Sequence, residues 1–104
     1  MLNLLVISTM LLNSSLALAN GKSVYETNCM SCHGVKGDGL GDAGKYMSPH
    51  PRDFTKGQFK NGSSKQELKH TVKMGIDGTA MPGFSSLTDQ ELSDVVDYIL
   101  GFKK

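Results

Sequence analysis

The clearest hydrophobic pattern of the chain lies near its C-terminal end. Four apolar residues there follow the i, i+3, i+4, i+7 spacing of an amphipathic helix: Leu92, Val95, Val96 and Ile99. The segment from Thr88 to Glu91 has the Thr-x-x-Glu pattern of a capping box, and Gly101 provides a stop signal. The pattern therefore predicts a helix that begins after Thr88 and ends near Gly101.

Weaker patterns predict two further helices upstream. Ser64 and Glu67 form a second capping-box pattern, an apolar stripe follows, and Gly75 can end that helix. Nearer the N-terminus, three residues spaced i, i+4, i+7 define one face of a short helix over residues 21–28 and its continuation: Tyr25, Cys29 and Cys32. We expect both thiols on the same face as the aromatic ring.

Long loops connect these predicted helices. Residues 34–44 are rich in glycine, Pro49 and Pro51 keep residues 48–53 extended, and residues 75–86 form a second loop. The chain contains no strand alternation, internal repeat or domain linker. The glycine-rich loop is not a phosphate-binding loop, because neither a strand before it nor a strong helix after it is predicted. The fold class is therefore all-α, with three or four short helices.

The N-terminal stretch has the pattern of an export signal. Met1 to Leu12 is almost entirely apolar, and a polar Asn-Ser-Ser break leads to Ala17-Leu18-Ala19, an A-x-A cleavage pattern. The segment carries no Lys or Arg, and a membrane anchor is the alternative. Such an anchor needs about 20 continuous apolar residues. We predict a signal peptide over residues 1–19, cleaved after Ala19, and a domain over residues 20–104 with no stable membrane insertion.

Composition limits what the remaining domain can be. It has no Trp and few other aromatic residues, so a chain this short has difficulty building an adequate core without a staple. Basic residues outnumber acidic ones from Lys36 to Lys73, whereas the segment from Asp77 to Asp97 carries only acidic ones. This distribution gives a modest dipole and does not indicate nucleic-acid binding.

The segment from Cys29 to His33 has the CxxCH pattern that attaches c-type haem. Two thiols on one helical turn can reach the two vinyl groups of one porphyrin, and the next residue can ligate its iron. Both cysteines of the chain lie in this motif, which makes a chance match improbable. We expect one covalently bound haem (heme c), which also supplies the missing staple. A thiol-disulfide oxidoreductase would use CxxC, but it would require a βαβ pattern that the sequence lacks.

A second axial ligand would make the iron suitable for electron transfer, and a neutral thioether would raise its potential. The candidates outside the attachment motif are Met47, Met74 and Met81, with His50 and His70 as alternatives that would give bis-His iron. Met81 lies in a loop stiffened by Pro82 before the last predicted helix, and this position favours it as the ligand. The other residues remain as alternatives.

With these motifs the chain resembles the class I cytochrome c family, in particular its small bacterial monohaem members. The resemblance rests on Gly21 to Tyr25, on Cys29 to Gly34, on Met81-Pro82 and on Tyr98-Ile99, in the family's order, and Pro51 to Phe54 adds to it. It implies thioether bonds from Cys29 and Cys32, His33 as proximal ligand and Met81 as distal ligand. It also implies a contact between the first and last helices through Tyr25 and Tyr98.

Three further residue roles are expectations. The Arg52 guanidinium is a candidate partner for a haem propionate, and the Pro49 carbonyl is a candidate acceptor for the His33 ring N–H. Lys65, Lys69 and Lys73 are spaced four apart, so they share a helix face that is a candidate for steering redox partners.

These residues favour a soluble periplasmic electron carrier without enzymatic activity, a monomer that forms transient complexes with redox proteins. The first alternative is a dedicated cytochrome subunit of a periplasmic oxidoreductase complex. A haem enzyme or gas sensor would need an open iron position, which a ligand at Met81 argues against.

Overall fold

The computed structural model describes residue 16 and residues 20–104 of the chain, and this part is helical throughout its regular structure. The predicted signal peptide over residues 1–19 lies outside the described residues except for position 16. The helical elements follow in order: residues 20–28, α2 (Met30–His33), η1 (Gly44–Tyr46), η2 (Phe54–Lys56), α3 (Lys65–Met74) and α4 (Asp89–Leu100), where η marks a 3₁₀ helix. The all-α prediction is confirmed for these residues.

Both predicted capping boxes are present. The Glu67 N–H donates to Ser64 Oγ at 3.1 Å, and the Ser64 N–H donates back to the Glu67 carboxylate at 3.3 Å. At the start of α4 the reciprocal distances between Thr88 and Glu91 are 3.1 and 2.9 Å. Each pair satisfies two backbone donors that a helix start leaves without partners. The sequence signals therefore locate the starts of α3 and α4 correctly.

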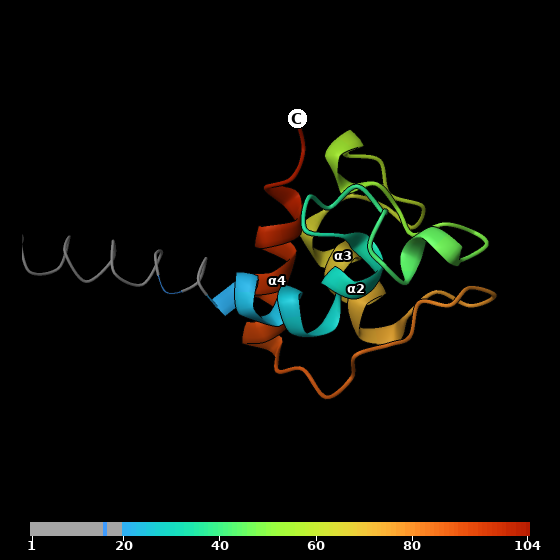
Figure 1. Cartoon of the computed structure of the whole chain (residues 1–104). Helices are drawn as coiled ribbons and strands as arrows, with labels where there is room; N and C mark the ends of the chain where they lie inside the picture. The colour runs from blue at the N-terminus through green and yellow to red at the C-terminus, as the bar shows by residue number, and fades with distance from the viewer. Residues whose placement is uncertain (1–15, 17–19) are drawn as a thin grey trace, which may run out of the picture.

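The N-terminal helix crosses α4 at close range (Figure 1). A Cβ at Gly21 would collide with the Asp94 carbonyl oxygen of α4, so only glycine allows this approach. Tyr25 is 1% exposed, and its ring centroid lies 5.2 Å from that of Tyr98. The predicted contact between the first and last helices is confirmed.

The apolar stripes of α3 and α4 face each other and form most of the core. Leu68 and Val72 come from α3, and the α4 residues are those that set the helical period: Leu92, Val95, Val96 and Ile99. Full burial of such side chains stabilises the fold by about 1.5–3 kcal/mol each. Phe54 and Cys29 extend this core towards the loops.

Two ion pairs join α3 to α4 at the edge of the core. The Lys65 ammonium lies 3.1 Å from the Asp97 carboxylate, and Lys69 lies 2.9 Å from Asp89. These two lysines of the predicted steering face are therefore paired with acidic residues of α4. The face differs from the expectation because helical spacing alone does not reveal the neighbouring helix.

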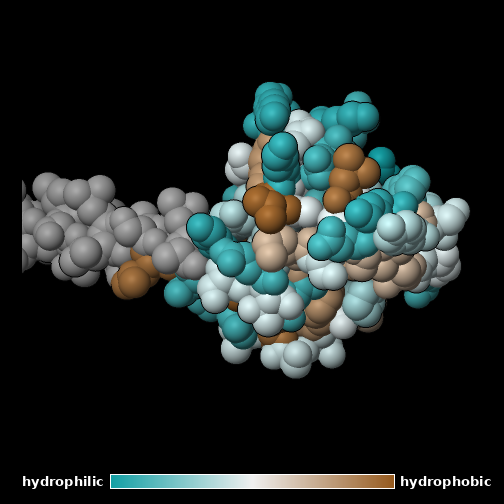
Figure 2. All heavy atoms as spheres, viewed as in Figure 1, coloured by the Kyte–Doolittle hydropathy of each residue, from teal (hydrophilic) through white to brown (hydrophobic). Residues whose placement is uncertain are grey.

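The glycine-rich loop after α2 folds back onto that helix. The N–H groups of Gly39 and Gly41 donate to the His33 and Cys32 carbonyls at 2.8 and 3.1 Å, and the Ala43 N–H donates to Ser31 at 3.0 Å. The apolar groups on the face shown in Figure 2 lie apart from one another among polar atoms. Within the described residues, no helix combines the length and the apolar character that a membrane span requires.

Candidate functional site

The CxxCH segment is wound as one helical turn that begins at Cys29. The Cys32 and His33 N–H groups both donate to the Cys29 carbonyl, at 3.2 and 2.9 Å. Cys29 and His33 are buried, and Cys32 is half-buried. Gly34 ends the turn with a φ of 86°, a left-handed value that favours glycine. The two thiols are not joined to each other.

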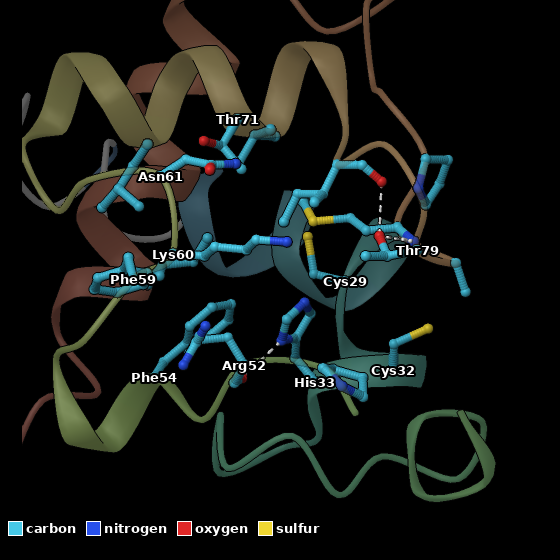
Figure 3. A pocket seen from close by; sticks show the side chains of 18 of the residues that line it. Cys29, Cys32, His33, Arg52, Phe54, Phe59, Lys60, Asn61, Thr71 and Thr79 are labelled. Carbon is cyan, nitrogen blue, oxygen red and sulfur yellow. Dashed lines mark hydrogen bonds between the residues drawn. The ribbon is translucent and has the colours of Figure 1, made fainter. Parts of the chain in front are cut away.

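A cavity of about 380 Å³ opens beside this turn. Residues from α2, the following loops, α3 and the loop before α4 line it, and Figure 3 shows many of them. The predicted site residues are all among its walls: Cys29, Cys32, His33, Arg52 and Met81. Residues distant in sequence therefore converge on one space, as the ligand hypothesis requires.

The ring of His33 is held by two contacts from one short segment. Its Nδ1 donates to the Arg52 carbonyl oxygen at 3.1 Å, as drawn in Figure 3. Because a carbonyl can only accept, Nδ1 carries the proton and Nε2 keeps its lone pair for a metal. The prediction that Pro49 supplies this carbonyl is wrong. The acceptor lies three residues later, in the irregular segment that leads into η2.

The second contact comes from Phe54. Its ring stacks on the His33 ring with centroids 4.3 Å apart and an interplanar angle of 17°. Burial lowers the pKa of His33, an effect that the hydrogen bond to Arg52 partly opposes. The imidazole is therefore kept neutral, which is the form that binds metal.

Cys29 is a poor candidate for thiol-disulfide chemistry. Burial raises the pKa of its thiol to about 11. Redox-active CxxC motifs depend on a cysteine pKa lowered towards or below neutrality, because the thiolate is the nucleophile. The environment of Cys29 thus suits a thiol consumed in a covalent bond better than a thiol that cycles.

Met81 lies in a loop that folds back on itself. Its N–H donates to Thr79 Oγ1 at 3.2 Å, and its carbonyl accepts from the Ile76 N–H at 3.3 Å. The Thr79 hydroxyl donates in turn to the Ile76 carbonyl at 2.7 Å. These bonds place the half-buried Met81 at the wall of the cavity.

The structure separates the other ligand candidates. Met74 is 60% exposed at the end of α3 and does not line the cavity, and His70 also lies outside it. Met47 and His50 do line it. Three cavity residues were not predicted from the sequence: Phe54, Lys60 and Thr79. The only signal for any of them was that the segment over residues 51–54 resembles known proteins.

The chemistry of the cavity fits a haem. Its walls are mainly apolar, and the described residues contain no group of three or more His, Cys, Asp or Glu side chains that could hold a bare metal ion. A porphyrin brings four in-plane nitrogen ligands of its own and needs only axial donors from the protein. Its apolar disc matches the walls, and its carboxylates match the polar residues Arg52, Lys60 and Asn61.

Comparison with known proteins agrees with this fit. The family model described as Cytochrome c matches residues 18–103. The chain belongs to the cytochrome c family. Membership implies one covalently bound haem c with its iron, and the chain is a small monohaem class I cytochrome.

Individual relatives of this cytochrome differ in size. Cytochrome c-555 of Prosthecochloris aestuarii is 35% identical over 89 residues, which cover 80% of this chain and 85% of the relative. Thiosulfate dehydrogenase of Allochromatium vinosum is 33% identical over 78% of this chain, but the match spans only 30% of that protein.

Among solved structures, a chain of the reducing HAO-like protein complex of Kuenenia stuttgartiensis superposes with a TM-score of 0.76. It is 31% identical to this chain, and the match covers 85% of this cytochrome and 44% of that chain. The cytochrome c fold is therefore present both in small proteins and in parts of larger ones.

Proposed function

We propose that this cytochrome is a soluble periplasmic electron-transfer protein whose single haem iron is ligated by His33 and Met81. The observation that carries the proposal is the convergence of Cys29, Cys32, His33 and Met81 on one apolar cavity. In this proposal the two cysteines form the thioether bonds, and the Arg52 guanidinium binds a haem propionate.

The bound haem supplies a one-electron couple between ferric and ferrous iron. The protein residues keep the coordination the same in both states. His33 is fixed by the Arg52 carbonyl and by Phe54, and Met81 is presented by a loop with its own hydrogen bonds. The apolar walls exclude water from the iron, which favours the less charged ferrous state and raises the potential.

The proposed ligand set argues against an enzymatic role. A haem enzyme needs an open iron position, and we propose that Met81 fills it. The similarity to a small cytochrome c-555 over most of both chains supports a carrier that performs no substrate chemistry. The electron donor and acceptor would then be redox proteins that bind transiently.

Export to the periplasm is part of the proposal. The apolar start and the A-x-A pattern support a signal peptide over residues 1–19 and a mature domain over residues 20–104. N-terminal sequencing of the native protein should begin at Asn20. A native protein that retains Met1 would contradict cleavage.

A second candidate is a cytochrome subunit of an oxidoreductase complex. It is favoured by the similarity to part of a thiosulfate dehydrogenase and to a chain of a larger complex. Gel filtration of a native extract separates the two candidates. A free carrier elutes near the 11.2 kDa of the chain or slightly below it, whereas a subunit elutes with its partner.

The ligand assignment is tested with three matched variants. Ferric iron with a thioether ligand has a weak absorption band near the red end of the spectrum. Met81→Ala should abolish this band, lower the potential and open the iron to carbon monoxide in the ferrous state. Met47→Ala and Met74→Ala should keep all three properties. A band that survives in Met81→Ala and disappears in either control would overturn the assignment.

A further inference from the structure

We propose that Phe54 is a positioning residue that sets the rotation of the His33 ring and shields its hydrogen bond to Arg52. This inference rests on the proposed role of His33 as the proximal ligand. It concerns a residue that does not touch the iron and acts only through the imidazole.

The geometry around His33 fixes the ring in two directions. The bond from Nδ1 to the Arg52 carbonyl, 3.1 Å long, lies at the edge of the imidazole and restrains tilting. The stacked ring of Phe54, with centroids 4.3 Å apart, covers one face of the imidazole and restrains rotation. In Figure 3 the Phe54 ring lies directly beside that of His33. A hydrogen bond alone would allow the ring to rock about its donor atom.

Phe54 is itself fixed by burial and by hydrogen bonds of its neighbours, so its ring can restrain the imidazole. It is 7% exposed, and its N–H donates to the Gly37 carbonyl at 2.7 Å. Asp53 caps η2 by accepting from the Thr55 N–H at 2.9 Å. The C-terminal Lys104 N–H also donates to the Thr55 carbonyl, at 3.0 Å. These contacts connect Phe54 to the loop after α2 and to the end of the chain.

Aromatic neighbours complete the support. The ring of Phe59 lies 5.8 Å from that of Phe54, and the ring of Phe102 lies 6.3 Å away, both at small interplanar angles. Only Phe54 in this group stacks on His33. Phe102 is half-buried and does not line the cavity, so it supports Phe54 without contacting the imidazole or the haem site.

Two consequences follow for the bound haem. The plane of an axial imidazole sets which iron d orbital overlaps with it, so ring rotation changes the electronic structure of the ferric state. The apolar ring of Phe54 also keeps water from the Nδ1–H, and this hydrogen bond adjusts the donor strength of the imidazole. A side chain that only filled the core would affect stability without affecting either property.

The experiment uses the holoprotein with Phe54→Leu and, as matched control, Phe102→Leu. Phe54→Met, which keeps most of the volume without a ring, serves if the leucine variant does not fold. The readouts are the hyperfine-shifted haem methyl resonances of the ferric protein and the exchange rate of the His33 Nδ1–H. Unfolding by urea is measured in parallel.

We expect the Phe54 variants to change the order or spread of the methyl shifts and to increase Nδ1–H exchange at least tenfold. Phe102→Leu should lose stability but keep the wild-type values of both, because Phe102 does not line the cavity. A wild-type shift pattern in both Phe54 variants would overturn the proposal, and so would an equal change in Phe102→Leu. Failure of the proposed ligand set is seen separately, in the wild-type spectrum and in Met81→Ala.

Discussion

The two sides of the haem cavity are built differently. On the proximal side, His33 is buried, and the loop from Gly34 to Lys56 is bound to α2 by several short backbone hydrogen bonds. On the distal side, Met81 is half-buried in a loop whose inner hydrogen bonds join Met81 to Ile76 and Thr79. Two N–H groups near the ends of this loop, those of Gly75 and Phe84, donate to carbonyls of α3 at 2.8 and 2.9 Å. The proposed proximal ligand is thus part of the folded core, whereas the proposed distal ligand is carried by a local structure.

This difference suits the two ligands to different demands. In the proposed ligation, the His33 imidazole is on the same turn as both cysteines, so displacing it would disrupt the attachment segment. The Met81 side chain would leave the iron when its loop opens, at a cost set mainly by the loop itself. We therefore expect substitutions on the proximal side to affect global stability and those on the distal side to affect access to the iron.

The largest contrast should come from two glycine substitutions. A Cβ at Gly44 would collide with the Cys32 carbonyl oxygen and lie 3.0 Å from Pro51, so the proximal loop would have to move off α2. We expect Gly44→Ala to destabilise the holoprotein by about 3 kcal/mol. A Cβ at Gly78 on the distal side would meet nothing within 4 Å, and its φ of 77° predicts a cost of about 1 kcal/mol.

Urea unfolding of both variants, followed by near-ultraviolet circular dichroism, measures these costs. Equal destabilisation by Gly44→Ala and Gly78→Ala would contradict the view that the proximal loop is bound to the core more tightly than the distal loop. If Gly44→Ala alone lost the absorption band that a methionine ligand gives to ferric iron, the proximal loop would control the proposed distal ligand as well.

The second largest loss of stability should come from removing the hydrogen bond that joins the first helix to the proximal loop. The buried Tyr25 hydroxyl donates to the Gly34 carbonyl at 2.6 Å. Tyr25→Phe leaves this carbonyl without a partner, and we expect a loss of about 2 kcal/mol in the free energy of unfolding. The distal loop should be unaffected, so the weak absorption band of ferric iron with a methionine ligand should persist.

This bond also predicts a pH dependence. Burial raises the pKa of Tyr25 above its ordinary value of 10.0, because the buried phenolate is poorly solvated. The folded state therefore holds this proton more tightly, so the contribution of Tyr25 is complete below pH 10 and is lost as the pH rises towards the folded pKa. The advantage of wild type over Tyr25→Phe should shrink above pH 10 in urea titrations. A constant difference from pH 8 to 11 would contradict this.

The sequence predicted the helices better than the loops, for a physical reason. Capping boxes at Ser64 and Thr88 are local signals, because all their hydrogen bonds join residues three apart. The partner of His33 is 19 residues away in sequence, and nothing in the pattern of Pro49 to Asp53 distinguishes one carbonyl from another. The attachment motif was equally local, and it located Cys29 and His33 at the cavity.

Phe54 and Lys69 illustrate what sequence alone could not provide. Phe54 is not part of any helical or strand spacing pattern, and its stacking on His33 depends on how the proximal loop folds. The lysines of α3 have helical spacing that predicts a common face, but their pairing with α4 depends on the packing of the two helices. Tertiary neighbours decide such roles.

A smaller effect is expected from Thr79 in the distal loop. Thr79→Val removes the acceptor of the Met81 N–H and the donor to the Ile76 carbonyl. We expect the loop to lose about 1 kcal/mol, which increases its open population about fivefold. Binding of imidazole to the ferric protein should tighten by that factor, because in the proposed ligation Met81 leaves the iron more readily. Wild-type imidazole affinity together with a large loss of global stability would assign this loop to the core.

The smallest effect concerns the ends of the distal loop. Lys69 of α3 and Asp89 of α4 pair at 2.9 Å, and this contact joins the helices that precede and follow the loop. The hydrogen bond and the charge of Lys69 lower the pKa of Asp89 below its ordinary 3.8. Because the folded pKa is the lower one, the contribution of the pair is complete above pH 3.8 and is lost as the pH falls through the folded value.

Asp89 is 87% exposed on its side chain, so solvent and salt screen the pair, and Asp89→Asn should lower the urea midpoint only slightly at pH 7. The difference from wild type should vanish at pH 2 and in high salt. Asp77→Asn is the matched control, since Asp77 is exposed and forms none of the four ion pairs of the described residues. If Asp89→Asn instead opened the iron to imidazole as far as Thr79→Val does, the distal loop would depend on its anchoring helices rather than on its own hydrogen bonds.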